Sequence, residues 1–298
     1  MTPVEPDPVS TGEGMSEPGL TLAARFMPSP RLKGSSMTSA TLSPALPIRD
    51  QVVLVTGGAR GLGARLVQSF LGEGARVVVN YLGSADAARE TAAAFPKRAV
   101  AIQADVRDPA QVAALVDEAA AYFGSPINTV INNALADFSF NGDARPHADA
   151  LTWENLDQQF SGTVRGALNT VQSALPGMRA TGFGRIINVG TNLFQNPVVP
   201  YHDYTAAKAA LLSLTRTLAH DLGPDGITVN MVSGGLLRTT DASSDTPEAV
   251  FDLIAAGTPL RRVTTPEEFA DAALFFASPW SRSVTGQNLV VDGGLVMS

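Results

Sequence analysis

The sequence predicts an α/β fold in one domain, with a doubly wound parallel sheet of about seven strands and helices on both faces. From about residue 50 onward, short β-branched runs alternate with alanine-rich amphipathic stretches. The runs are apolar throughout, without the clean alternation of a strand that has one face in water, so we expect a sheet covered on both sides. The repetition extends over about 250 residues, which fits a single doubly wound domain.

The expected elements follow one another in a regular order along the chain. β-branched and apolar runs predict strands at 52–56, 76–80, 99–103, 129–132, 185–189, 228–232 and 288–291. Amphipathic periodicity predicts helices near 62–72, 84–95, 109–123, 152–180, 203–222 and 266–277. A further apolar helical patch follows Pro247, in a segment (236–256) that we expect either to cover the site as a lid or to form a solvated loop around Thr239, Thr240, Ser243 and Ser244.

The first 47 residues differ from the rest in composition. They hold eight of the 20 prolines, with many Ser, Thr and Gly and no sustained period. We expect a disordered Pro/Ser-rich leader at 1–47 and the folded domain at 48–298. The acidic start, with Glu5 and Asp7, fits neither a secretory signal nor a transit peptide, so we expect a cytoplasmic protein.

Composition excludes several kinds of function. The chain has no Cys and three scattered His, which argues against disulfides, thiolate zinc sites and a metal centre. A net charge of −7 disfavours a nucleic-acid partner, and no apolar run is long enough to span a membrane.

A glycine-rich turn follows the first predicted strand. Its sequence is Gly57-Gly58-Ala59-Arg60-Gly61-Leu62-Gly63, and a helical stripe of Leu66, Val67 and Phe70 comes next. Glycines let the backbone approach a pyrophosphate closely, and the free amides and the dipole of the next helix attract its charge. A strand, a glycine turn and a helix in this order predict a Rossmann-type dinucleotide site that uses Gly57, Arg60, Gly61, Leu62 and Gly63. A turn without a ligand is the alternative.

Two positions predict which dinucleotide binds. Asn80 ends the second predicted strand, where a carboxylate would select NADH by repelling a 2′-phosphate. Arg60 lies inside the glycine turn and would attract such a phosphate, unless it is only a solvated turn residue. We therefore expect NADPH to be preferred over NADH.

Tyr204 and Lys208 stand four residues apart on a predicted helix, which places both side chains on one face. A fixed ammonium near a phenol favours the phenolate, so we expect Lys208 to lower the pKa of Tyr204 and make it a usable proton donor and acceptor.

The glycine turn and the Tyr-Lys pair together resemble the short-chain dehydrogenase/reductase family, from about Asp50 to the C-terminus. The resemblance includes Asp105-Val106, Asn132-Asn133-Ala134, the strand Gly184-Arg185-Ile186-Ile187-Asn188-Val189, and the closing run from Val284 to Gly294. Within the family the chain looks most like the 3-oxoacyl-acyl-carrier-protein reductases.

That resemblance implies a role for each matching residue. Tyr204 would be the general acid toward a substrate carbonyl, and Lys208 would bind the nicotinamide ribose. Asp105 would contact the adenine and Val106 would line its pocket, while Asn132 and Ala134 would border the ribose and nicotinamide.

The chain departs from the family at several positions. Thr191 replaces the usual Ser thirteen residues before the Tyr, which keeps a hydroxyl but adds a methyl group and narrows the pocket. Thr163 stands where many members have an Asn on the long helix. Leu135 and Ser233 replace the usual Gly and Pro beside the nicotinamide and substrate side.

These observations predict NADPH-dependent reduction of a carbonyl, in a 3-oxoacyl thioester or related ketone, by Thr191, Tyr204 and Lys208. Two alternatives stay open: a non-catalytic dinucleotide-binding sensor or structural subunit, and an alcohol dehydrogenase that works in the oxidative direction. The family resemblance also implies a homotetramer or homodimer and, as a possible partner, an acyl carrier protein.

Overall fold

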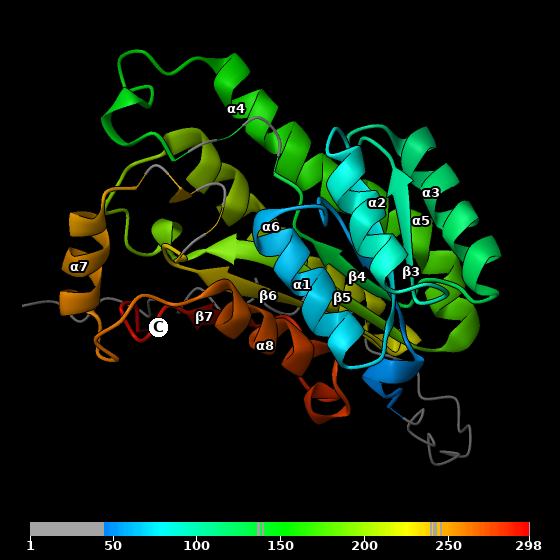
Figure 1. The fold of residues 1–298 in the computed structure, drawn as a ribbon. Coiled ribbons are helices and arrows are strands. Elements are labelled where there is room, and N and C mark those ends of the chain that lie inside the picture. Colours follow the sequence, from blue (N-terminus) through cyan, green and yellow to red (C-terminus); the bar gives the residue numbers. More distant parts are fainter. Residues whose placement is uncertain are drawn as a thin grey trace, which may run out of the picture. The chain divides into compact units, whose positions relative to one another are not determined.

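A computed structural model describes residues 45–135, 138, 140–238, 240, 243–244 and 246–297. The predicted leader falls almost wholly on residues 1–44, outside the described residues, and stays a prediction. The described part from residue 45 onward belongs to one compact unit, in which helices pack on both faces of a central sheet (Figure 1).

The sheet has seven parallel strands in the order β3-β2-β1-β4-β5-β6-β7, which confirms the predicted fold class. The strands start or end within two residues of the predicted bounds. They are β1 (Val52–Val55), β2 (Arg76–Tyr81), β3 (Ala99–Gln103), β4 (Thr129–Asn132), β5 (Gly184–Thr191), β6 (Ile227–Gly234) and β7 (Asn288–Val291).

Two layers of helices bury the two faces of the sheet. α1 (Gly61–Gly72), α2 (Ala85–Ala94) and α8 (Pro266–Ala277) contribute to one apolar cluster, centred on Leu66, Phe70, Phe269 and Phe276. α3 (Pro109–Phe123), α5 (Gly166–Thr181) and α6 (His202–Leu222) contribute to the other, which includes Leu115, Val171 and Met178. Burial of both strand faces explains why the strand sequences lack a polar alternation.

Side-chain caps fix where several helices begin. The Asp108 carboxylate accepts hydrogen bonds from the backbone N–H groups of Ala110 and Gln111 at the start of α3, where Pro109 occupies the first turn. Thr265 and Glu268 form a capping box at the start of α8. Such caps satisfy amides that a helix leaves unpaired at its first turn, so these boundaries are encoded locally.

The stretch predicted as one helix over 152–180 is interrupted. α4 (Trp153–Phe160) passes into a π-helical turn (Ser161–Arg165) before α5 begins. A π turn adds one residue to a single turn of the helix. This change produces no recognisable hydrophobic pattern, so the spacing of apolar residues could not reveal it.

The predicted lid segment is only partly described. Thr239 and residues 241, 242 and 245 lie outside the described residues, while the apolar patch after Pro247 forms α7 (Glu248–Gly257). Ser243 is buried, and its hydroxyl donates to the carbonyl of Leu237 at 2.8 Å.

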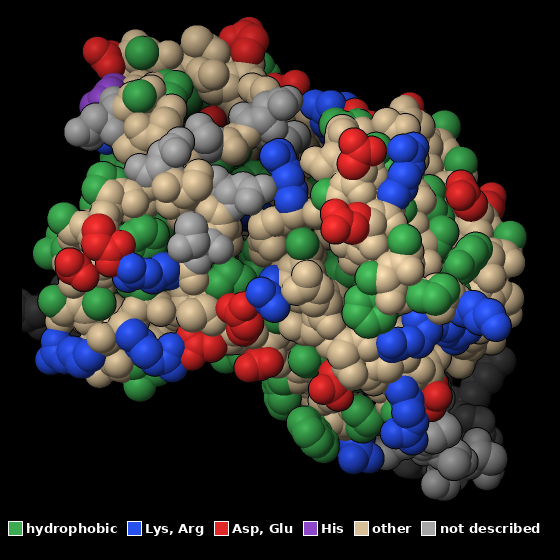
Figure 2. Space-filling view, in the orientation of Figure 1, with side chains coloured by type: hydrophobic (Ala, Val, Ile, Leu, Met, Phe, Trp, Pro, Cys, Tyr) green, Lys and Arg blue, Asp and Glu red, His purple; other side chains and the backbone are tan. Residues whose placement is uncertain are grey.

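The surface carries charges of both signs. Figure 2 shows Lys and Arg side chains interspersed with Asp and Glu over the face that it draws. None of the described helices is long and apolar enough to cross a membrane.

Candidate active site

The strand order reverses between β1 and β4, which pair directly although two strands separate them in sequence. In a doubly wound sheet, ligands bind at the carboxyl ends of the strands beside such a reversal. The glycine turn follows β1 and the Asn133-Ala134 segment follows β4, so both predicted cofactor motifs lie at this switch point.

The glycine turn has a shape that side chains would prevent. Gly57 and Gly61 have φ values of +60° and +54°, and α1 begins at Gly61. A Cβ on Gly63 would lie 2.1 Å from the Gly57 carbonyl oxygen. Asn133 Nδ2 braces the turn by donating to the carbonyls of Thr56 (2.9 Å) and Gly57 (3.2 Å). The tightly packed turn therefore leads directly into the N-terminus of α1, where backbone N–H groups can bind an anion.

Asn80 supports this turn from within the protein. Its side chain is 2% exposed, accepts from the Gly57 N–H at 3.2 Å, and donates to the Ala104 carbonyl at 3.1 Å. These bonds join the glycine turn to the end of β3. A contact of Asn80 with the cofactor stays a prediction.

Arg60 and Leu62 lie where α1 starts. Arg60 is the N-cap residue of α1 and is exposed, and Leu62 is partly buried against the apolar cluster. An arginine at this place has access to a phosphate that approaches the helix N-terminus.

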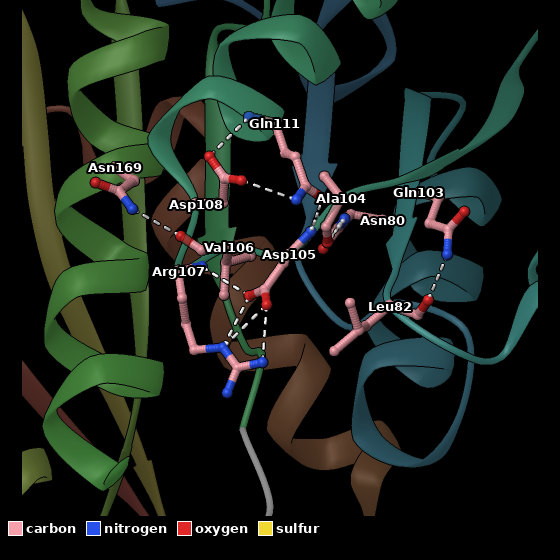
Figure 3. Close-up of polar contacts among 10 residues, drawn as sticks. All are labelled: Asn80, Leu82, Gln103, Ala104, Asp105, Val106, Arg107, Asp108, Gln111 and Asn169. Atoms are coloured by element: carbon pink, nitrogen blue, oxygen red, sulfur yellow. Dashed lines mark hydrogen bonds and ion pairs between the residues drawn. The ribbon is translucent and has the colours of Figure 1, made fainter. Parts of the chain in front are cut away.

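Arg107 binds the Asp105 side chain two positions before it in the sequence (Figure 3). Arg107 donates to the Asp105 carboxylate through Nε at 3.0 Å and through Nη2 at 2.8 Å. The hydrogen bonds from Arg107 lower the pKa of Asp105. The carboxylate expected at the adenine is therefore ionised and already paired with a guanidinium.

Val106 is fixed by α5. Asn169 Nδ2 donates to the Val106 carbonyl at 2.8 Å, and a Cβ on Gly166 would lie 2.9 Å from Val106 Cγ2 (Figure 3). The glycine thus lets α5 approach the loop after β3, which sets the position of the predicted adenine pocket wall.

Asn132 belongs to a buried hydrogen-bond network. Its Nδ2 donates to Asn188 Oδ1 at 2.8 Å, and its Oδ1 accepts from Thr170 Oγ1 at 2.6 Å. Asn188 Nδ2 donates in turn to Thr215 Oγ1 at 2.8 Å. These bonds join β4, β5, α5 and α6 beneath the site. The backbone N–H of Ala134 donates to Thr56 Oγ1 at 3.0 Å.

Three predicted catalytic side chains meet where β5 ends and α6 begins. Tyr204, Lys208 and Thr191 are 5%, 3% and 4% exposed, so all three are buried. Lys208 Nζ lies 5.7 Å from the centre of the Tyr204 ring and donates to the Val189 carbonyl at 2.6 Å. Thr191 Oγ1 accepts from the Leu193 N–H at 3.3 Å, which leaves its own hydrogen to donate. The helical spacing thus places the Tyr-Lys pair on one face.

Burial controls the protonation of this group. It raises the pKa of Tyr204 to about 12, although a hydrogen bond with the Thr191 hydroxyl offsets part of the rise. Burial also lowers the pKa of Lys208 to about 8. Loss of water thus shifts the pKa of Tyr204 upward, in the direction opposite to the fall expected from Lys208.

Thr163 lies in the π turn beside a small cavity. The cavity is lined by Thr56, Val106, Asn132, Thr163 and Lys208 together with small residues of the long helix. Thr163 is 4% exposed, and its hydroxyl has no hydrogen-bond partner within the described part of the chain. The π turn therefore directs a polar atom toward the space behind Lys208.

Aromatic side chains surround Tyr204, and no sequence pattern predicted them. The Phe138 ring stacks on Tyr204 with the centroids 4.4 Å apart, and Phe140 and Tyr201 pack against the same rings. Phe138 lies 66 positions before Tyr204, and no periodicity connects a loop with a distant helix.

The residues at the switch point fit an NAD(P) cofactor. Positive-φ glycines, a helix N-terminus and a neighbouring arginine suit a pyrophosphate and a further phosphate. Lys208, Asn132 and Ala134 line one small cavity at the same edge of the sheet. Within the described residues, no group of three or more His, Asp or Glu is arranged to hold a metal ion.

Comparison with known proteins supports this assignment. A family model described as enoyl-(acyl carrier protein) reductase matches residues 57–296. The match therefore includes the glycine turn and the Tyr-Lys pair.

Curated relatives align over nearly their whole length. A probable galactose dehydrogenase of Rhizobium meliloti is 33% identical over 83% of this chain and 96% of its own. A putative ketoacyl reductase of granaticin polyketide synthase from Streptomyces violaceoruber is 35% identical over 86% and 98%. A chloroplastic NADPH-dependent aldehyde reductase of Arabidopsis thaliana is 30% identical over 87% and 98%.

A solved structure has the same fold. A double mutant of a short-chain dehydrogenase/reductase from Serratia marcescens superposes with a TM-score of 0.73 at 33% identity, covering 84% of this chain and 99% of that one. The names of the relatives differ in substrate.

Proposed function

Because the chain belongs to the short-chain dehydrogenase/reductase family and is an NAD(P)-dependent oxidoreductase of that type, we propose that it reduces a ketone to an alcohol with NADPH. The substrate is a 3-oxoacyl thioester or a related ketone. The observation that supports this proposal most is that Tyr204, Thr191 and Lys208 lie buried together where β5 ends and α6 begins.

Each side chain has one task in the proposed reaction. NADPH, when bound, supplies a hydride to the carbonyl carbon. Tyr204 donates its phenolic proton to the carbonyl oxygen, and the Thr191 hydroxyl donates a hydrogen bond to the same oxygen. Lys208 stabilises the phenolate that remains until a proton from solvent restores the phenol. The products are the alcohol and NADP⁺.

The protonation state of Tyr204 at neutral pH fits the proposed reduction. A phenol with a pKa of about 12 is protonated at neutral pH, and protonated Tyr is the form that reduction requires. Oxidation of an alcohol would require the phenolate, which burial disfavours.

NADPH preference rests on Arg60 and on the missing carboxylate. Arg60 is exposed at the N-cap of α1, while the end of β2 presents the amide Asn80 rather than Asp or Glu. A carboxylate there would repel a 2′-phosphate, so its absence from this position permits NADPH. The Arabidopsis relative, described as NADPH-dependent, is consistent with this choice.

A cofactor and substrate panel tests the proposal. We would measure oxidation of NADPH and of NADH with 3-oxoacyl thioesters of coenzyme A and of acyl carrier protein, with aliphatic ketones and with aryl ketones. We expect turnover with NADPH and at least one ketone, and a higher kcat/KM for NADPH than for NADH. Tighter binding of NADH would refute the cofactor choice. NADPH binding without turnover of any carbonyl or alcohol would favour a non-catalytic sensor or subunit.

The oxidative alternative is tested by the same samples. The Rhizobium relative is described as a dehydrogenase, so the reverse reaction belongs in the panel. We would measure NADP⁺ reduction with the matching alcohols at neutral pH. A higher kcat/KM for the alcohols than for the ketones would overturn the proposed direction.

A further inference from the structure

Four aromatic side chains meet at the amino end of α6. Tyr201 and Tyr204 come from the start of that helix, and Phe138 and Phe140 come from the segment after β4. The Phe138 ring lies nearly parallel to Tyr204, at 4.4 Å and an interplanar angle of 17°. The Phe140 ring stands edge-on to Tyr204 at 5.7 Å and to Tyr201 at 5.6 Å.

The segment that supplies these two rings is tied to α6. The backbone N–H of Gly142 donates to the Tyr201 hydroxyl at 2.8 Å. Phe138 and Phe140 also pack against each other edge to face, with their centroids 5.0 Å apart. Backbone and ring contacts together hold both rings in place beside Tyr204.

The phenylalanine rings retain accessible surface, unlike the tyrosines. Tyr201 and Tyr204 are each 5% exposed, whereas Phe138 and Phe140 are only partly buried. A substrate carbonyl has to reach the Tyr204 hydroxyl, so the groups bonded to that carbonyl come next to the Tyr204 ring and its aromatic neighbours. Phe138 and Phe140 both contact the Tyr204 ring, which brings them beside those groups.

Aromatic walls discriminate by shape and charge distribution. A flat unsaturated group can stack on one ring or meet another edge to face, whereas a saturated ring is thicker and lacks the matching quadrupole. We propose that Phe138 and Phe140 form the substrate wall of this site and select planar, conjugated ketones over saturated ketones of the same size. This inference rests on the function proposed above.

A matched pair of substrates tests the wall. We would measure kcat/KM with NADPH for methyl phenyl ketone and methyl cyclohexyl ketone, which have the same carbon skeleton but differ in flatness. Phe138→Leu should lower kcat/KM for the phenyl ketone about tenfold, while the cyclohexyl ketone changes less than about twofold, because one aromatic contact is lost. The change in ratio between variants cancels the intrinsic reactivity of the two ketones.

Two control variants define the result. Phe138→Tyr keeps an aromatic face and should keep the wild-type ratio. Phe275→Leu removes a ring from α8, which packs on the other face of the sheet, and should also leave the ratio unchanged. An unchanged ratio in Phe138→Leu would overturn the inference.

A binding measurement separates this inference from the reaction itself. Tyr204→Phe keeps the ring that stacks on Phe138 but lacks the proton donor. We would measure the affinity of both ketones for this variant with NADPH, by saturation-transfer NMR, with and without Phe138→Leu. A phenyl preference that disappears with Phe138→Leu supports the wall even if no ketone is turned over, a result that would refute only the proposed function. Equal affinities in all variants would refute the wall.

Discussion

Lys208 is 3% exposed, and its ammonium donates to the Val189 carbonyl. Burial lowers the pKa of Lys208 from 10.5 to about 8. The unfolded chain therefore binds more protons than the folded one between pH 8 and pH 10.5, so Lys208 makes stability rise with pH in that window. Below pH 8 the buried charge is present in full and its cost is greatest. Lys208 thus lies at a place where its charge destabilises the protein, as expected for a group that serves chemistry.

The loss of stability caused by the buried Lys208 charge is measurable by unfolding Lys208→Met and the wild type in urea at pH 7.5 and at pH 9.5. We expect the free energy of unfolding of the wild type to rise by about 2 kcal/mol more than that of the variant, because 1.36 kcal/mol corresponds to each pH unit between the two pKa values. Parallel changes in the two proteins would show that Lys208 is not buried in its charged form.

Thr191 is the second residue whose part in the reaction can be isolated. Thr191→Val keeps the shape but removes the hydroxyl, and we expect kcat to fall at least about a hundredfold with the NADPH dissociation constant unchanged. Thr191→Ser keeps the hydroxyl and should stay within about threefold of the wild type. Wild-type kcat in Thr191→Val would contradict a role for the hydroxyl in the reaction.

At the scale of elements, the glycine turn joins β1, α1 and β4 into the proposed cofactor site. The Gly57 carbonyl faces Gly63 so closely that even a methyl group does not fit, and Asn80 and Asn133 brace the same turn from β2 and β4. The shape of the turn therefore depends on side chains from other elements.

Two glycines of α1 provide a matched test of this turn. Gly63→Ala should lower the free energy of unfolding by about 2 kcal/mol through overpacking and should weaken NADPH binding. Gly72→Ala, at the other end of the helix, meets no heavy atom within 4 Å and should leave both unchanged or raise stability by less than about 1 kcal/mol. Wild-type NADPH affinity in Gly63→Ala would contradict the assignment of this turn to the pyrophosphate.

Helix and strand positions were predictable because the signal is local. The apolar run at 99–103 indicates its own strand, and Asp108 with Pro109 marks the start of the helix at 109–123. The π turn at Ser161–Arg165 was not predictable, because it inserts one residue without breaking the apolar pattern.

At the scale of the whole molecule, the candidate site was only partly predictable. The Tyr204-Lys208 pair and the glycine turn were predictable, because each consists of residues that lie close together in the sequence. In contrast, the bonds of Asn80 to Ala104 and the stack of Phe138 on Tyr204 join positions 24 and 66 residues apart. Such contacts arise only when the sheet brings strand ends together, and they decide which side chains support the fold and which face the substrate.

The central claim is that Tyr204 transfers the proton in an NADPH-dependent carbonyl reduction. The most direct test compares Tyr204→Phe with the wild type by NADPH titration and by NADPH oxidation with the best ketone of the panel. We predict NADPH affinity within about twofold of the wild type, since the ring stays in place, and a kcat reduced at least about a hundredfold, since phenylalanine has no proton to donate to the carbonyl oxygen. Wild-type turnover by Tyr204→Phe would contradict the account.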